Sequence, residues 1–190
     1  MQVALAKTSY ECTDVFWEKK ETTFNSLIVI LPVFLARIFS LALALPQGSW
    51  HLWCDVFVLN EKSEVLIIQR ADNGFWAMPG GCHDLGETPK ACAERECREE
   101  SGYVVIVTDL LGVFSSNRYE YINYPWKENE FCHLLFRAEV VGGEAKTSSE
   151  SLKVGWFDEG ALPKFSDGHE IRVRFGFKAA HNPNFKPYFE

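Results

Sequence analysis

Short runs of apolar and β-branched residues, separated by polar turns, make up most of the chain from Trp50 onward. Such runs are typical of β-strands. They fall at residues 52–59, 64–69, 103–107, 110–114, 131–140 and 152–157. The first two runs flank the polar segment 60–63, which predicts a β-hairpin. Gly142-Gly143 marks a turn after the fifth run.

A helix is predicted over residues 88–101, between the second and third runs. Thr88 is a residue type that caps a helix N-terminus, and Pro89 suits the first turn. Gly102 supplies a residue that adopts the left-handed conformation at a helix end. Upstream, Pro79-Gly80-Gly81 predicts a flexible turn whose backbone can approach a ligand closely.

A second helix is predicted from Asp167-Gly168 to about Ala180. The same stretch also fits a strand, because apolar residues alternate through it at positions 171, 173, 175 and 177. With helices and strands interspersed in this way, the pattern predicts a mixed α/β domain over residues 51–190.

The first 50 residues have a different pattern. Residues 1–23 are mixed and polar, whereas residues 24–49 are apolar with Arg37 as their one charged side chain. About 20 apolar residues would span a membrane, but Arg37 would lie near the middle of the span, which is costly. We therefore predict a helical, apolar N-terminal segment over residues 1–50 that packs on the main domain or on a partner subunit. Membrane attachment through residues 24–49 is the alternative.

Composition and net charge restrict the possible classes of function further. The chain has 190 residues and a net charge of −7, and residues 51–190 carry all of that charge, with 15 Lys and Arg against 22 Asp and Glu. Nucleic-acid binding is not expected, because it needs clustered cations. The six cysteines show no CxxC pair, which favours free thiols in a cytoplasmic protein. The oligomeric state stays open between a monomer and a homodimer.

Three glutamates stand out on the first predicted helix. Glu96, Glu99 and Glu100 stand at i, i+3 and i+4, so their carboxylates share one helix face. Such a face is ordinarily solvated. Hard divalent cations, however, also bind clustered carboxylates, and Mg²⁺ takes one or two of them together with substrate phosphates.

The surrounding segment resembles the Nudix box, Gly-x5-Glu-x7-Arg-Glu-U-x-Glu-Glu-x-Gly-U, in which U is apolar. It matches at every fixed position: Gly81, Glu87, Arg95, Glu96, Glu99, Glu100 and Gly102. The U positions hold Cys97 and Tyr103, which are mild departures. The resemblance covers about residues 52–190 and implies the Nudix α/β/α sandwich with a mixed sheet. Residues 1–16 also resemble a short helical domain that precedes some Nudix domains acting on nucleoside diphosphates linked to another moiety.

The resemblance implies a metal site and a catalytic set. Glu96, Glu99 and Glu100 would bind Mg²⁺ or Mn²⁺, and the Gly81 carbonyl would complete the set. Glu87 and Arg95 are expected to form an ion pair that joins the box loop to the helix. For the general base, the resemblance favours Glu150 in the loop before the last strand, with Glu99, Glu128 and Glu130 as the alternatives.

Substrate contacts are predicted on two further segments. Arg70, at a strand end, would hold a phosphate, or else form a surface ion pair. Tyr121 and Trp126 belong to an aromatic loop cluster that would stack on a nucleobase or pack on the domain. Four histidines lack Cys or carboxylate partners at ligand spacing and are predicted to be structural: His51, His133, His169 and His181.

The function implied by the resemblance is metal-dependent hydrolysis of the diphosphate bond in a nucleoside diphosphate linked to another moiety, such as ADP-ribose or CDP-choline. A nucleoside-triphosphate pyrophosphatase is the enzymatic alternative. A catalytically silent Nudix-like ligand sensor is the alternative from another class, although a sensor has no need of three crowded carboxylates.

Overall fold

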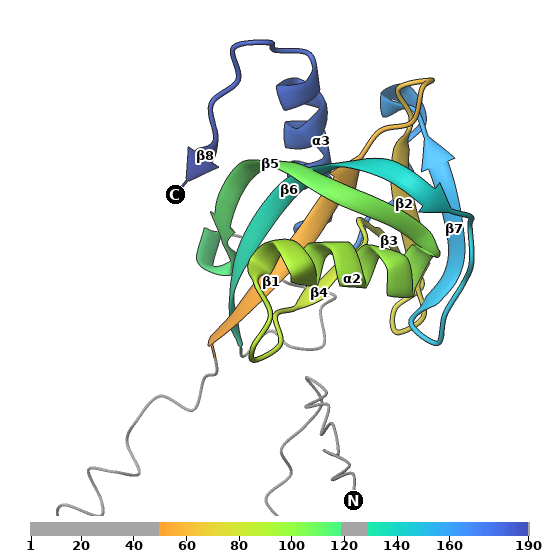
Figure 1. Cartoon of the computed structure of the whole chain (residues 1–190), viewed down its shortest axis with the longest axis horizontal. Coiled ribbons are helices and arrows are strands. Elements are labelled where there is room, and N and C mark those ends of the chain that lie inside the picture. Colours follow the sequence, from red (N-terminus) through yellow and green to blue (C-terminus); the bar gives the residue numbers. More distant parts are fainter. Residues whose placement is uncertain (1–49, 119–128, 190) are drawn as a thin grey trace, which may run out of the picture. The chain divides into compact units, whose positions relative to one another are not determined.

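The computed structural model describes residues 50–118 and 129–189, which form strands and helices in an α/β arrangement (Figure 1). The strands are β1 Trp50–Val58, β2 Val65–Arg70, β3 Trp76–Ala77, β4 Gly80–Cys82, β5 Tyr103–Ser115, β6 Glu130–Gly143, β7 Ser151–Phe157 and β8 Tyr188–Phe189. The helices are α2 Pro89–Ser101 and α3 His169–Ala180, with short 3₁₀ turns at Ser116–Arg118 (η1) and Glu159–Ala161 (η2). The N-terminal segment 1–50 was predicted to be helical, and all of it except Trp50 lies outside the described residues.

Two sheets form the centre of the domain. The larger sheet has the order β4-β1-β6-β5-β8, and the smaller one has the order β3-β2-β7. The larger sheet is mixed, because β1 runs parallel to β6 while β5 is antiparallel to β6. This confirms the predicted mixed α/β fold.

The two helices cover opposite faces of β1. On one face, Val56 packs with Cys92 and Cys97 of α2, and on the other face Phe57 packs with Phe177 of α3. Successive strand residues point to opposite faces, so the continuous apolar run of β1 is buried on both sides. In Figure 1, α2 lies across the sheet and α3 lies near its upper end.

The predicted hairpin between the first two strands is wrong. The turn itself is present, since the backbone N–H of Asn60 donates to Glu64 at 3.0 Å. Only one bridge, Leu59–Val65, follows it before the strands part into different sheets. Both strands are buried on both faces and find their partners far along the chain, which a local turn signal cannot reveal.

The flexible turn predicted at Pro79-Gly80-Gly81 is also wrong. Gly80 and Gly81 belong to β4, which pairs antiparallel with β1 in the register Asp55–Gly80 and Cys54–Gly81. These glycines serve close packing, because a Cβ on Gly80 would lie 2.6 Å from the Cys54 carbonyl oxygen. Short strands β3 and β4 were not predicted, since two or three residues carry no periodic signal.

The turn predicted at Gly142-Gly143 is wrong as well, because both glycines continue β6 and pair with Val104 and Tyr103 of β5. The other predicted elements agree with the structure. The runs at 103–107 and 110–114 form one strand, β5, which is interrupted by irregularities near Val107 and Leu110. The stretch after Gly168 is a helix, so the strand alternative is excluded. All five cysteines within the described residues are free thiols. No helix among those residues is long and apolar enough to cross a membrane.

Candidate active site

Helix α2 carries the predicted site, and the sequence signals at its ends are those that define it. The Thr88 hydroxyl accepts a hydrogen bond from the Ala91 backbone N–H at 3.2 Å. Gly102 ends the helix at φ 79°, a left-handed conformation, and its N–H donates to the Arg98 carbonyl at 3.0 Å. These caps hold the glutamate-bearing face of α2 against β4.

Glu100 is the most enclosed carboxylate of the three. Its side chain is buried, and its Oε2 accepts a hydrogen bond from the Gly80 backbone N–H at 2.8 Å. Burial raises the pKa of Glu100 well above its usual value, and the charges of Glu96 and Glu150 raise it further, against a lowering by Gly80 and Arg70. The carboxyl is therefore fixed in place, and its surroundings favour the protonated form.

Glu96 lies directly against the backbone of β4. A Cβ at position 81 would overlap its carboxylate, so a larger residue there would displace the Glu96 side chain. Burial raises the pKa of Glu96 to about 7; Arg95 opposes this shift, while Glu99 and Glu150 add to it. Arg95 Nη1 lies 2.6 Å from Glu96 Oε1.

Glu87 and Arg95 form the predicted ion pair between the box loop and the helix. Arg95 binds both carboxylate oxygens of Glu87, at 2.8 and 3.1 Å, and also donates to the Cys82 carbonyl at 3.3 Å. Burial alone would raise the pKa of Glu87, but the hydrogen bond from Arg95 and one from the Asp84 N–H lower it to about 2. The loop is thereby held to α2 and to the end of β4.

Glu99 and Glu150 are the more accessible carboxylates of the group. Glu99 is exposed and lies 3.2 Å from Arg95 Nη1. Glu150 is exposed in the loop before β7, where its carbonyl accepts a hydrogen bond from the Ala71 N–H at 2.8 Å. The charge of this loop carboxylate raises the pKa of both Glu96 and Glu100, so it acts electrostatically on the α2 glutamates.

Arg70 forms the ion pair that was one of the two roles considered for it, and its contact with a phosphate stays a prediction. Its guanidinium pairs with Asp72 through two contacts of 2.7 and 2.9 Å, which is the surface ion pair. Its side chain is nevertheless only 12 % exposed, and its charge lowers the pKa of Glu100. Arg70 therefore borders the carboxylate group and supplies positive charge there.

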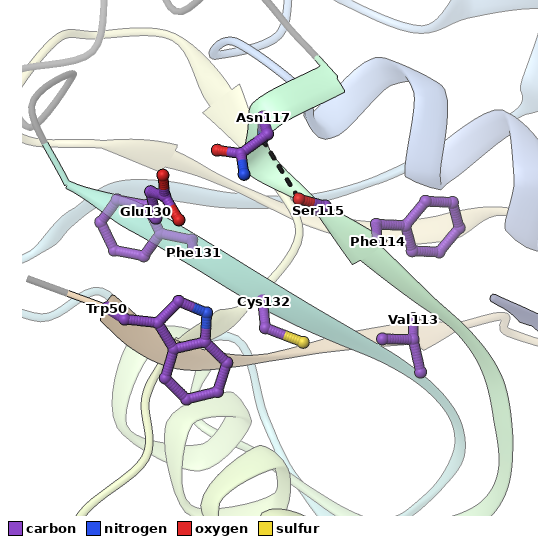
Figure 2. Close-up of a pocket in the computed structure, with 8 residues that line it drawn as sticks. All are labelled: Trp50, Val113, Phe114, Ser115, Asn117, Glu130, Phe131 and Cys132. Atoms are coloured by element: carbon purple, nitrogen blue, oxygen red, sulfur yellow. Dashed lines mark hydrogen bonds between the residues drawn. The ribbon is translucent and has the colours of Figure 1, made fainter. Parts of the chain in front are cut away.

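Other predicted residues are not brought to this group. Tyr121, Trp126 and Glu128 lie outside the described residues. Glu130, an alternative base, lines a pocket of about 180 Å³ with Trp50, Phe131, Cys132 and residues 113–115 and 117 (Figure 2). Within the described residues, this pocket is lined from β1, β5, η1 and β6, whereas the glutamates lie on α2.

The donor chemistry fits a hard divalent cation. Glu96, Glu99 and Glu100 provide oxygen ligands, and the missing side chain of Gly81 leaves room for the Glu96 carboxylate against β4. In their present rotamers, no three His, Cys, Asp or Glu side chains of the described residues surround a common point. Burial, with the charges of neighbouring carboxylates, raises the pKa of Glu96 and of Glu100, and a bound cation would lower both.

A second polar group was missed by sequence reasoning. His133 and His169 were predicted to be structural and without carboxylate partners, yet Asp55 lies 3.2 Å from His133 and 3.0 Å from Arg172. The one available signal was an aspartate in the middle of an otherwise apolar strand. Its partners are distant in sequence and could not be assigned.

Comparisons with known proteins agree with this geometry. Residues 51–175 match the family described as the NUDIX domain. A MutT-like protein of Streptomyces ambofaciens is 39 % identical over 99 residues, which cover 52 % of this chain and 58 % of that protein. An ADP-ribose pyrophosphatase of Methanocaldococcus jannaschii is 32 % identical over 120 residues, covering 62 % and 68 %.

The fold has a counterpart among solved structures. An ADP-ribose pyrophosphatase of Streptococcus suis superposes with a TM-score of 0.62 at 22 % identity, covering 74 % of this chain and 98 % of that one. At that identity, the likeness shows the fold.

Proposed function

The chain belongs to the NUDIX family, and from this premise we propose that it is a metal-dependent hydrolase of nucleoside diphosphates linked to another moiety. The substrates proposed are of the ADP-ribose or CDP-choline type. The observation that carries the proposal is that the α2 glutamates meet strand β4, where Glu100 accepts a hydrogen bond from the Gly80 N–H and Glu96 lies against Gly81. The naming of the M. jannaschii relative as an ADP-ribose pyrophosphatase supports the substrate class.

Glu96, Glu99 and Glu100 would hold Mg²⁺ or Mn²⁺. When bound, such a cation neutralises diphosphate oxygens and lowers the pKa of an attacking water. The buried Glu100 is positioned by the Gly80 N–H, so its carboxylate is oriented before substrate arrives. A silent ligand sensor would gain nothing from this arrangement, which costs the fold buried and mutually repelling carboxylates.

The remaining residues would transfer a proton and bind the diphosphate. Glu150, which is exposed and acts electrostatically on Glu96, would accept the proton from the water that attacks phosphorus, with Glu99 as the alternative acceptor. Arg70 would bind an oxygen of the diphosphate. The new P–O bond forms as the bridging P–O bond breaks, and the products are a nucleoside monophosphate and the phosphorylated second moiety.

A substrate panel tests the proposal. The full chain is incubated with ADP-ribose, CDP-choline, UDP-glucose and nucleoside triphosphates, with Mg²⁺, with Mn²⁺ or with EDTA. Phosphate is measured after phosphatase treatment for the diphosphate-linked substrates and after inorganic pyrophosphatase treatment for the triphosphates. Release from a diphosphate-linked substrate that requires the metal is expected. Release from triphosphates alone would favour the pyrophosphatase alternative, and binding without turnover would favour the sensor.

A further inference from the structure

The backbone of Glu150 is held on both sides by hydrogen bonds. Its N–H donates to the hydroxyl of Ser148 at 3.1 Å, and its carbonyl accepts from the Ala71 N–H at 2.8 Å. Ala71 directly follows Arg70, the last residue of β2. The loop is therefore attached to the strand end that carries Arg70, although the Glu150 side chain is exposed.

Ser151, the next residue, connects this loop to the helix that carries the glutamates. Ser151 is 1 % exposed, and its hydroxyl donates a hydrogen bond to the Glu100 carbonyl at 2.6 Å. The same hydroxyl oxygen accepts a hydrogen bond from the Ser148 N–H at 2.9 Å. One buried hydroxyl group thus binds α2 with its hydrogen and the Glu150 loop with its oxygen.

The pairing of β2 with β7 is irregular at the same place. Gln69 pairs with Lys153 and Arg70 pairs with Ser151, so the register skips Leu152. In an uninterrupted register Leu152 would lie opposite Arg70. A bulge of this kind changes which side chains face the neighbouring element, and bulges are common beside active sites. Here Ser151 is buried against α2, whereas Leu152 is 55 % exposed.

A buried hydroxyl at this point also caps the helix. The last carbonyls of a helix have no partner inside it, and Glu100 is the last residue but one of α2. The Lys146 N–H caps the next carbonyl, that of Ser101, at 2.9 Å. Capping alone, however, does not require that the Ser151 hydroxyl also bind Ser148, the residue that holds the Glu150 N–H.

We propose that Ser151 is a positioning residue that fixes Glu150 relative to the proposed metal-binding face of α2. The inference rests on the proposed function for the role of Glu150 as the general base. A base must lie within hydrogen-bond reach of the proton that it removes, and a displacement of about 1 Å costs about a hundredfold in rate. Because the Glu150 side chain is exposed, its position depends on the backbone that carries it.

Ser151→Ala removes the hydroxyl and with it both contacts. With the best wild-type substrate and metal, kcat is expected to fall about tenfold while KM changes by less than about twofold, because a misplaced base affects the transition state. Ser101→Ala is the matched control, since Ser101 is buried at the same end of α2 but its hydroxyl donates within the helix, to the Cys97 carbonyl at 2.5 Å. Its kcat should stay within about twofold of the wild type. An equal loss in the two variants would overturn the inference.

A double-mutant cycle with Glu150→Gln shows whether Ser151 acts through Glu150. In that case, adding Ser151→Ala to Glu150→Gln lowers kcat by less than about twofold, because the displaced side chain no longer accepts the proton. A hydroxyl that only stabilises α2 would cause the same loss in both backgrounds, and this result would overturn the inference. A fully active Glu150→Gln variant would also overturn it, while leaving the proposed hydrolysis intact.

Hydrogen exchange of the full chain tests the attachment without turnover. Ser151→Ala is expected to speed the exchange of the amides of Ala71 and residues 148–151 about tenfold, whereas Ser101→Ala leaves their rates unchanged. Ser148→Ala, at an exposed position, removes the acceptor of the Glu150 N–H and is the second variant, with the same expected result. Unchanged exchange in both loop variants would overturn the inference. Faster exchange in a chain that hydrolyses none of the substrates would support the attachment of the loop and overturn the proposed function.

Discussion

The Glu100 carboxyl group is buried, accepts a backbone hydrogen bond and lies under the influence of other negative charges. Its carboxyl is held by the Gly80 N–H at 2.8 Å, and its raised pKa favours the protonated form in the absence of a cation. An amide of the same shape can therefore replace it without loss of the hydrogen bond. The role of its negative charge can thus be separated from its role in packing.

Glu100→Gln is expected to leave the melting temperature within a few degrees of the wild type and to lower turnover by about a hundredfold or more. The loss follows because a charge-stabilising ligand typically contributes a few kcal/mol to the transition state. Steady-state rates at saturating Mg²⁺, with calorimetric melting of the same samples, measure both effects. Turnover near the wild-type value would contradict the metal-site assignment.

Glu150 is exposed, so its replacement tests proton transfer with little effect on the fold. Glu150→Gln is expected to lower kcat far more than it raises KM and to remove the acidic limb of the pH–rate profile, which reports the essential base. Glu99→Gln and Glu130→Gln are the comparison variants. If only Glu99→Gln loses that limb, the base lies on α2.

At the scale of elements, the ion pair of Glu87 and Arg95 joins the box loop to α2. Arg95→Ala is expected to lower the free energy of unfolding by about 2 kcal/mol, because it removes a two-point hydrogen bond between charged groups. Activity should fall as well, since the loop is released. Urea unfolding at pH 7 measures the change, and Arg98→Ala, exposed on the same helix, is the control.

The pH dependence of this effect has a definite sign. The pKa of Glu87 is lowered to about 2 from 4.5, so its contribution to stability is present above about pH 4.5 and disappears as the pH falls toward 2. The difference between wild type and Arg95→Ala should therefore shrink over that interval. A difference that stays constant down to pH 2 would show that the pair does not stabilise the loop.

The elements that have local sequence signals were predicted, whereas the pairing of strands that are distant along the chain was not. The limits of α2 follow from Thr88, Pro89 and Gly102, which act within one turn of the helix. The hairpin was mispredicted because β1 takes β6 as its partner, and Trp50 pairs with Glu130, far along the chain. The carboxylates of α2 were predicted for the same reason as the helix, since their spacing alone places them on one face.

At the scale of the molecule, Asp55 ties three elements together, because its carboxylate meets Arg172 of α3 and His133 of β6. Asp55→Asn is expected to lower the free energy of unfolding by roughly 3 kcal/mol, because it leaves the Arg172 charge buried without a counter-charge. Glu170→Gln, which breaks an exposed pair with Arg174 on α3, should cost less than about 1 kcal/mol. Denaturant titration of both variants at pH 7 checks the contrast; equal losses would contradict it.

The fold as a whole was predicted through the resemblance of residues 81–103 to a known motif, and the structure and the family match confirm it. The Asp55 group could not be predicted in this way. Asp55 and His133 are 78 positions apart, and no spacing rule connects a strand aspartate with a histidine on another strand. Only the assembled sheet brings them to a common oxygen.

The parallel pairing of β1 with β6 also bears on how the chain folds. β1 is the first described strand, but its longest partner is made some 70 residues later, after β2, β4, α2 and β5. The chain loses the entropy of closing this long loop before the contacts between the strands can stabilise it. Folding of such topologies is therefore slow, on the order of milliseconds to seconds. During synthesis, one edge of the apolar strand β1 therefore remains without its final neighbour until residue 138, the last that pairs with it, has left the ribosome. This interval is when the nascent chain is most exposed to aggregation and most dependent on chaperones.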